Sequence, residues 1–230
     1  MADAVFVDLG ASAVLGLGGA TLGHAYFPTT CMISLLAPQT RDKRLVLGLT
    51  GYEGVYGGAC ALGIFSTAFD AVVTGAGQAW QIDADRLAAH GRTSDGLLSL
   101  LSHFLYVELR QLGTQAICSH FHSLQQRLSR YLLMSQDRMR SPDLWLTHDD
   151  LSEMLGVRRA GVTEAAGELQ ALGLIRYNRG HVYIIDRSNL LTQACTCYLQ
   201  DQLIYSHVMN SSSDRQVEET RQQNAGYTED

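Results

Sequence analysis

The sequence has almost no lysine: Lys43 stands alone among 17 basic residues, and the other sixteen are arginines. It also lacks a long hydrophobic run, because glycines interrupt the weakly polar stretch from Ala11 to Ala25 and no apolar segment reaches the roughly 18 residues of a membrane span. No basic residue precedes Arg41, so we expect no signal peptide. Five cysteines, an odd number, argue against a disulfide framework. We therefore expect a cytoplasmic protein without a membrane partner.

A net charge of −6 at first argues against a nucleic-acid partner, but the charge is unevenly distributed. Residues 1–126 carry six basic and nine acidic side chains, which gives −3, and residues 188–230 carry two and six, which gives −4. Residues 127–187 carry nine arginines and eight acids, which gives +1. Only this middle block is not acidic, so the total does not exclude a nucleic-acid partner there, and planar guanidinium groups favour specific over diffuse recognition.

Residues 1–92 have the pattern of a β domain. Short apolar segments recur every 8–12 residues or so, with Gly, Pro, Asp and Thr between them, as in a jelly-roll or barrel. The expected strands include Val5–Val7, Met32–Leu36, Leu45–Leu49, Ala71–Val73 and Ala79–Ile82.

The pattern becomes helical near Asp95, and the sequence has no proline from there to Met139. One apolar stripe has steps of three, four and seven: Leu98, Leu101, Leu105 and Leu112. A long helix with such a stripe favours packing on a second long helix, which would make a homodimer. Burial of the stripe against the chain's own β domain is the alternative. Residues 93–140 are thus expected to hold a dimerisation helix and a connecting helix.

Residues 141–198 have the features of a winged helix-turn-helix. Thr147 is a good N-cap, Asp150 completes an approximate capping box, and Gly156 ends the short helix. A second helix is expected from Arg158 to Leu172, followed by two strands joined by a glycine-containing turn. Residues 199–230 are expected to form a polar, acidic tail that is partly disordered.

In such a domain the second helix enters the major groove and its first residues meet base edges. Arg159 suits guanine, Thr163 a thymine methyl group and Glu164 the amino group of cytosine. Two further residues suit phosphate oxygens, one at a helix start and one at the wing tip. The predicted DNA-contacting residues are Thr147, Arg158, Arg159, Gly161, Thr163, Glu164 and Arg179.

Three separated blocks carry a resemblance. The first comprises Tyr26-Phe27-Pro28-Thr29, Ile33-Ser34-Leu35 and Gly51-Tyr52-Glu53-Gly54. The second comprises Cys118, His122-Ser123, Gln126-Arg127-Leu128 and Arg130-Tyr131-Leu132-Leu133. The third comprises Leu146-Thr147, Met154-Leu155-Gly156-Val157-Arg158-Arg159, Val162-Thr163 and Gly173-Leu174-Ile175. In order and spacing these blocks resemble the Crp/Fnr superfamily of bacterial transcription regulators.

This resemblance implies an α+β fold with an N-terminal cyclic-nucleotide-binding-like β-barrel sensor, a long dimerisation helix and a C-terminal winged helix-turn-helix. It implies a homodimeric regulator that binds a near-palindromic site in double-stranded DNA, with RNA polymerase as a further candidate partner. The family's base-reading arginine corresponds to Arg159. Ala160 and Glu164 replace the acid and the arginine that usually follow, so the operator sequence of relatives cannot be transferred.

The expected sensor departs from relatives that bind cyclic AMP. Gly58 stands where they have the acid for the ribose, and Ser66 where they have the arginine for the cyclic phosphate. A buried phosphate without a cation is costly, so we expect no classical cyclic-AMP binding. The effector is unknown, and the tentative effector pocket consists of Gly57, Gly58, Ser66, Thr67 and Leu112.

Metal and enzyme chemistry have little support in the sequence. An iron–sulfur sensor needs clustered cysteines near the N-terminus, where Cys31 is alone, so we expect no such cluster. We predict no metal site, and the weak candidates for one are Cys195, Cys197, Cys118 and His122. No catalytic signature appears, and we expect no enzyme. Two alternatives stay open: a sensing or protein-interaction module that has lost DNA binding, and a redox- or metal-responsive regulator.

Overall fold

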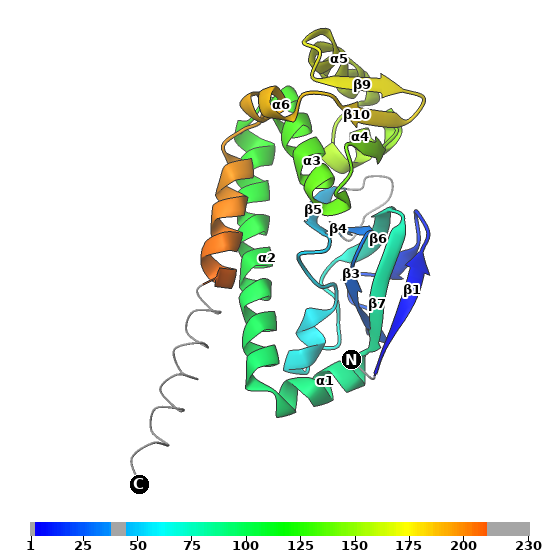
Figure 1. Cartoon of the computed structure of the whole chain (residues 1–230), viewed down its shortest axis with the longest axis vertical. Coiled ribbons are helices and arrows are strands. Elements are labelled where there is room, and N and C mark those ends of the chain that lie inside the picture. Colours follow the sequence, from blue (N-terminus) through cyan, green and yellow to red (C-terminus); the bar gives the residue numbers. More distant parts are fainter. Residues whose placement is uncertain (1–2, 38–44, 211–230) are drawn as a thin grey trace.

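The N-terminal part of the chain forms two stacked antiparallel sheets. The computed structural model describes residues 3–37 and 45–210, so Lys43 and the tail residues 211–230 lie outside the described part (Figure 1). The first sheet has the order β1 (Ala4–Leu9), β7 (Gly77–Asp83) and β3 (His24–Pro28). The second has the order β2 (Val14–Gly16), β6 (Asp70–Gly75), β4 (Met32–Leu36) and β5 (Val46–Thr50).

Strand β4 lies in the core of this domain. All five of its residues are buried, because β6 and β5 flank it and α3 (Leu124–Met139) packs on it. A continuous apolar strand of this kind is typical of a sheet that is covered on both faces. A short 3-10 helix, η1 (Gly58–Leu62), and α1 (Ala84–Thr93) close the domain beside the long helix α2 (Asp95–Phe121).

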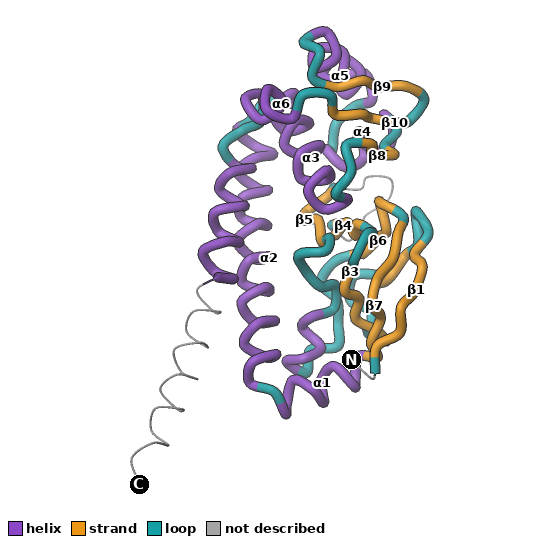
Figure 2. The backbone as a smooth tube through the Cα atoms, viewed as in Figure 1, coloured by secondary structure: helices purple, strands orange, loops and turns teal. Residues whose placement is uncertain are grey.

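Helix α2 runs along the whole sensor, as Figures 1 and 2 show. Ser94 caps its first turn, and α3 begins in a capping box formed by Ser123 and Gln126. Although α2 has 27 residues, no helix in the described part of the chain is both long and apolar enough to cross a bilayer.

The leucine stripe expected at a subunit contact lies on the inner face of α2. Leu101 is 3% exposed and Leu98 packs on the β-domain core, while Leu105 and Leu112 line a cavity in the sensor. These contacts are the burial against the chain's own β domain that the sequence left open as an alternative, and the predicted dimer contact of the stripe stays a prediction. An adjacent face, which points away from the buried residues Phe104, Val107 and Cys118, carries a row of exposed residues at alternating steps of four and three. We name this row the outer seam: Ser102, Tyr106, Leu109, Gly113, Ala116 and His120.

The C-terminal domain contains the expected helix pair and wing. Its sheet has the order β8 (Asp143–Trp145), β10 (His181–Ile184) and β9 (Ile175–Asn178). The helices are α4 (His148–Leu155), α5 (Arg159–Ala171) and α6 (Arg187–Gln193). The capping box of Thr147 and Asp150 is present, and Gly156 ends α4 with a positive φ.

One apolar core joins this domain to the sensor. It includes Met32, Leu49 and Val72 from the second sheet, Leu128 and Leu132 from α3, and Leu151, Leu155, Val162 and Leu169 from the helix pair. The helix-turn-helix domain is therefore packed on the chain's own β domain rather than held by a free linker.

The predicted tail differs from the structure in its first part, because residues 197–210 form a helix. This helix lies beside α2 (Figure 1). Asp201 forms a buried ion pair with Arg130 of α3, and the Tyr205 hydroxyl donates to the backbone oxygen of Glu53 at 3.0 Å. These polar anchors hold a segment whose polar composition suggested disorder.

Candidate nucleic-acid interface and sensor cavity

The outer face of α5 is open and consists largely of small residues. Val162, Ala165, Ala166 and Leu169 face the core. Arg159, Ala160, Thr163, Glu164 and Gly167 are exposed on the other face. A helix with short side chains on one face can lie close to the floor of a major groove, with longer side chains at its start reaching base edges.

Three residues at the start of the helix pair form a connected polar group. The Thr163 hydroxyl lies 3.1 Å from Nδ1 of His148 and donates to the backbone oxygen of Arg159 at 3.1 Å. The His148 ring stacks on Tyr177 of β9, with 4.1 Å between ring centroids. Removal from water, together with the charge of Arg159, lowers the pKa of His148 and so favours the neutral imidazole. Thr163 is thus held in place before any base is contacted.

Arg159 is available to a ligand. Its guanidinium lies 3.4 Å from the Asp149 carboxylate, and both side chains are about two-thirds exposed, so the pair is weak and easily exchanged for another partner. Arg158 precedes α5 and is exposed, as is Glu164 one turn later. These three residues lie at the start of the helix that is predicted to enter the major groove.

Two predicted DNA-contacting residues also have a structural role within the chain. Gly161 faces α3, where an added Cβ would lie 3.1 Å from Leu124, so this glycine permits close helix packing, and its contact with DNA stays a prediction. The Thr147 hydroxyl donates to Asp150 at 2.6 Å and accepts from the Asp150 amide, which makes it a cap within the chain. The sequence signals for a cap and for a phosphate contact are the same, and the structure shows the cap.

The arginine at the wing tip has a positive φ, a backbone conformation that is unfavourable for most residues. Arg179 has a φ of 47° and Gly180 a φ of 86°, and Asn178 pairs with His181 across the turn. Two consecutive positive φ values make a type I′ turn, which normally has asparagine, aspartate or glycine at its first central position. An exposed arginine kept there at a cost in backbone energy suggests a contact role at the wing tip.

Five of the nine arginines in residues 127–187 are used inside the protein. Arg127 donates to the backbone oxygen of Leu155, and Arg138 pairs with Glu53 at 2.9 Å. Arg130 pairs with Asp201 and Arg187 with Asp137, while Arg140 lies over the Tyr52 ring. Six of the nine are exposed, namely Arg140, Arg158, Arg159, Arg176, Arg179 and Arg187, and no contact that occupies Arg158 or Arg179 within the chain is seen among the described residues. The surface for DNA is therefore smaller than the charge count of the block suggests.

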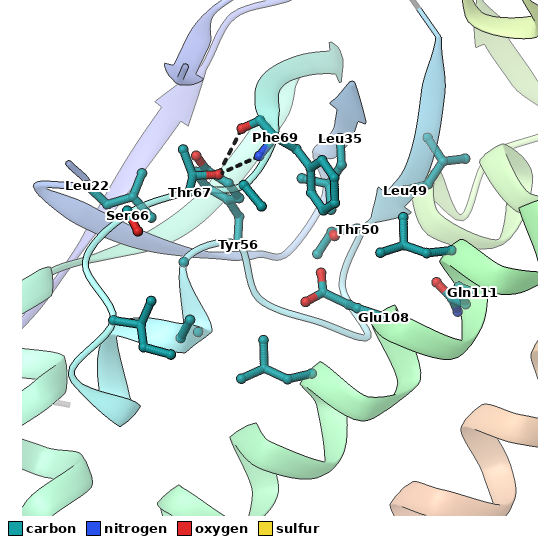
Figure 3. A pocket seen from close by; sticks show the side chains of 18 residues that line it. Leu22, Leu35, Leu49, Thr50, Tyr56, Ser66, Thr67, Phe69, Glu108 and Gln111 are labelled. Atoms are coloured by element: carbon teal, nitrogen blue, oxygen red, sulfur yellow. Dashed lines mark hydrogen bonds between the residues drawn. The ribbon is translucent and has the colours of Figure 1, made fainter. Parts of the chain in front are cut away.

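The sensor contains a cavity of about 240 Å³ between the sheets, η1 and α2 (Figure 3). All five residues of the predicted effector pocket line it, namely Gly57, Gly58, Ser66, Thr67 and Leu112. Gly57 needs its glycine: its φ is 84°, and an added Cβ would lie 3.1 Å from the backbone of Ala25. An added Cβ at Gly58 would lie 2.9 Å from Val55, so the acid of the cyclic-AMP-binding relatives does not fit without rearrangement.

The polar lining of the cavity is sparse. Thr67 is tied to Phe69 by two hydrogen bonds, of 2.8 and 3.3 Å, which Figure 3 shows as dashed lines. Glu108 projects from α2 into the cavity, and sequence reasoning missed it because it stands alone within a helix (Figure 3). Removal from water, with the charge of Glu53 nearby, raises the pKa of Glu108 to about 8. No lysine, arginine or histidine is among the lining residues of the described chain.

The four weak metal candidates come together, although no metal site was predicted. The ligand atoms of Cys118, His122, Cys195 and Cys197 all lie within 4.8 Å of one another, and the three cysteines form a small buried cluster. A hydrogen bond from Cys118, opposed by burial and aided by the charges of His122 and Arg130, lowers the pKa of Cys195 to about 5. Sequence spacing could not reveal this group, since its halves are 77 positions apart.

Comparison with known proteins agrees with this architecture. Residues 126–192 match the family described as the Crp-like helix-turn-helix domain. Among curated protein sequences none matches this chain.

Similar solved structures extend over most of the chain. FixK2 from Bradyrhizobium japonicum has 13% identity and a TM-score of 0.68, and the match covers 84% of this chain and 98% of FixK2. The c-di-GMP-responsive global regulator CLP of Xanthomonas campestris has 18% identity and a TM-score of 0.63, covering 80% of this chain and 94% of CLP. A CRP/FNR-family regulator from Thermus thermophilus has 20% identity and a TM-score of 0.63, covering 83% of this chain and 98% of that regulator. The sensor, the long helix and the DNA-binding domain thus share one fold with these regulators.

Proposed function

We propose that the chain is a member of the Crp/Fnr superfamily and a homodimeric transcription regulator that binds a specific DNA site, because it has a Crp-like helix-turn-helix domain and shares its fold with such regulators. We infer that it is not an enzyme, because the structures that share its fold are transcription regulators. The observation that carries the proposal is the open face of α5, where Arg158 and Arg159 flank small residues and Arg179 stands at the wing tip.

Each part of this surface has a separate role in the proposal. Arg159 contacts a guanine in the major groove, because its guanidinium is exposed and only weakly paired with Asp149. Arg158 and Arg179 contact phosphates on either side of the groove. Thr163, fixed by His148, contacts a thymine methyl group or an adjacent base edge.

Binding to DNA is tested by selecting sites from random duplexes and then measuring affinity by fluorescence anisotropy. Arg159→Ala is expected to weaken specific binding by about 1–3 kcal/mol and to relax the preference at one base per half-site. Arg92→Ala, an exposed arginine of α1 on the sensor, is the matched control. An unchanged footprint and affinity for Arg159→Ala would show that this residue does not read the site.

A salt titration distinguishes a regulator from a module that has lost DNA binding. Phosphate contacts release counterions, so the affinity of a DNA-binding protein falls steeply as the salt concentration rises. If the affinity did not change with salt concentration and no DNA site were selected, the result would support a module that has lost DNA binding.

Dimerisation is proposed through the outer seam of α2. Its residues repeat with the four-three spacing of a coiled-coil interface, and Gly113 and Ala116 allow two helices to approach closely. An added Cβ at Gly113 meets nothing within 4 Å in the single chain, so this face is open to a partner helix. Paired subunits would present two α5 helices to successive major grooves, about 34 Å apart on a near-palindromic site.

The sensor is proposed to bind a small, largely apolar molecule without a negative charge. The cavity has no cation to balance a phosphate, and Glu108 is its one carboxyl group among the described residues. The probes are N-phenyl-1-naphthylamine, which is neutral and apolar, and cyclic AMP. We expect N-phenyl-1-naphthylamine to bind to the wild type and not to Leu112→Trp, and we expect cyclic AMP not to bind. Binding of cyclic AMP without binding of N-phenyl-1-naphthylamine would contradict this ligand class.

A further inference from the structure

The most concentrated set of metal-ligand side chains lies outside both surfaces described above, where the upper end of α2 meets the chain after α6 (Figure 1). Cys118 is in the last turn of α2 and His122 is its C-cap residue. Cys197 is the first residue of the helix over 197–210, and Cys195 lies two positions before it. The three cysteines are buried and His122 is half-buried.

The distances within this group are those of ligands around one ion. Sγ of Cys118 lies 3.5 Å from Sγ of Cys195, and Sγ of Cys197 lies 3.6 Å from Nδ1 of His122. A tetrahedral zinc ion, with bonds of about 2.3 Å to sulfur and 2.05 Å to nitrogen, separates two sulfurs by about 3.8 Å and a sulfur from a nitrogen by about 3.6 Å. All four ligand atoms lie within 4.8 Å of one another, so they can surround a single ion without a large backbone movement.

The surroundings compensate the charge that such a site would carry. Three thiolates and a divalent ion sum to −1. The buried guanidinium of Arg130 is close enough to interact electrostatically with all three sulfurs, and its Nε has no hydrogen-bond partner among the described residues. Because Arg130 is itself paired with Asp201, Arg127, which interacts with Cys118 and Cys195, supplies the positive charge that balances the site. A buried anionic centre is stable only when paired in this way.

We propose that Cys118, His122, Cys195 and Cys197 form a mononuclear Cys3His zinc site. Closed four-coordinate sites of three cysteines and one histidine are typical of structural zinc, and the sulfur-rich ligand set favours zinc over magnesium or calcium. A disulfide between Cys118 and Cys195 would explain one short sulfur–sulfur distance. It would leave the placement of Cys197 and His122 at the same point unexplained.

The site would close the two ends of one long segment. Residues 123–194, which hold α3 and the whole DNA-binding domain, leave α2 beside Cys118 and His122 and return beside Cys195 and Cys197. A bound ion would therefore fix the position of this segment on α2. The DNA-binding domain would then be held to α2 by the bound ion in addition to hydrophobic packing.

The test uses the full-length protein, expressed with added zinc and purified with a phosphine reductant. We expect about one zinc per chain by mass spectrometry, and cobalt exchange should give the charge-transfer absorption of thiolate-bound Co²⁺. Cys197→Ser should lose this absorption. Cys60→Ser, which alters a buried cysteine elsewhere in the sensor, should keep it.

A second pair of variants avoids disturbing the core. His122→Gln should release zinc to a chelator at a concentration at least about tenfold lower than the wild type requires, because one of four ligands is gone. His120→Gln, an exposed neighbour on α2, should behave as the wild type. Fewer than about 0.1 zinc per folded chain with no cobalt absorption would overturn the proposal. A Cys118–Cys195 disulfide in metal-free protein isolated without reductant would also overturn it.

Discussion

Arg130 of α3 and Asp201 of the C-terminal helix form an ion pair with 2.6 Å between Nη2 and Oδ2, and both side chains are only 6% exposed. Arg130 also donates to the side-chain oxygen of Gln115 on α2 at 2.6 Å. Three helices that are distant in sequence thus meet at one guanidinium.

Removal of Asp201 should therefore be severe. Asp201→Ala leaves a buried, uncompensated charge on Arg130, and we expect a loss of about 3–5 kcal/mol in the free energy of unfolding. Ser206→Ala, an exposed change on the same helix, is the control and should have little effect. Urea denaturation followed by circular dichroism measures both. A loss below 1 kcal/mol or so for Asp201→Ala would mean that water reaches Arg130.

The wing tip offers a variant in which stability and DNA affinity move in different directions. Arg179→Asn puts a residue that tolerates positive φ at the first central position of the turn, so the unfolding free energy should stay equal or rise by up to about 1 kcal/mol. Affinity should fall for specific and random DNA alike, and the salt dependence should lose about one phosphate contact. Arg92→Asn is the control on α1. Unchanged salt dependence would remove Arg179 from the interface.

The outer seam contains an exposed leucine, Leu109, on which dimerisation is expected to depend. Leu109 is 64% exposed in the single chain, and Leu109→Glu would bring two carboxylates together across the proposed helix pair. We expect this variant to elute as a monomer and to lose affinity for a two-half-site duplex. Val5→Glu on β1, at 63% exposed, introduces the same charge at equal exposure and should stay dimeric. Light scattering after size-exclusion chromatography measures the mass, and a dimeric Leu109→Glu would exclude the seam.

Glu108 makes stability depend on pH in a defined direction. Its folded pKa of about 8 lies above the ordinary value of 4.5, so the folded state holds a proton that the unfolded state has released in this interval. Stability should therefore fall as the pH rises from about 4.5 to about 8, and Glu108→Gln should flatten this decline. Thermal unfolding across this range measures the effect. Parallel curves for the two proteins would show that Glu108 is solvated.

The elements of the DNA-binding domain could be predicted from the sequence because their signals depend on residues that are close together in the chain. The capping box of Thr147 and Asp150, the stop at Gly156 and the turn around Gly180 each depend on residues a few positions apart. All five predicted pocket residues line the cavity because the resemblance fixed their place in the barrel.

Features that depend on distant partners were not predictable in this way. Both faces of α2 carry apolar residues, so periodicity alone could not decide whether Leu101 or Leu109 faces outward. The helix over 197–210 is polar, and the anchor at Asp201 is visible only once Arg130 is placed against it. Gly161 has the position of a DNA-contacting residue in sequence, but close packing on Leu124 explains it.

Strand β5 separates the cavity from the DNA-binding domain by a single layer of backbone. Gly48, Leu49 and Thr50 line the cavity, while Val46 and Leu49 share the core that contains Leu155 of α4. The carboxamide of Gln115 on α2 holds this strand by donating to the backbone oxygen of Val46 at 3.1 Å. A molecule that swells the cavity would therefore press on the strand on which α4 rests. Amide hydrogen exchange of residues 46–50 would register occupancy directly, even for an effector that leaves the DNA affinity unchanged.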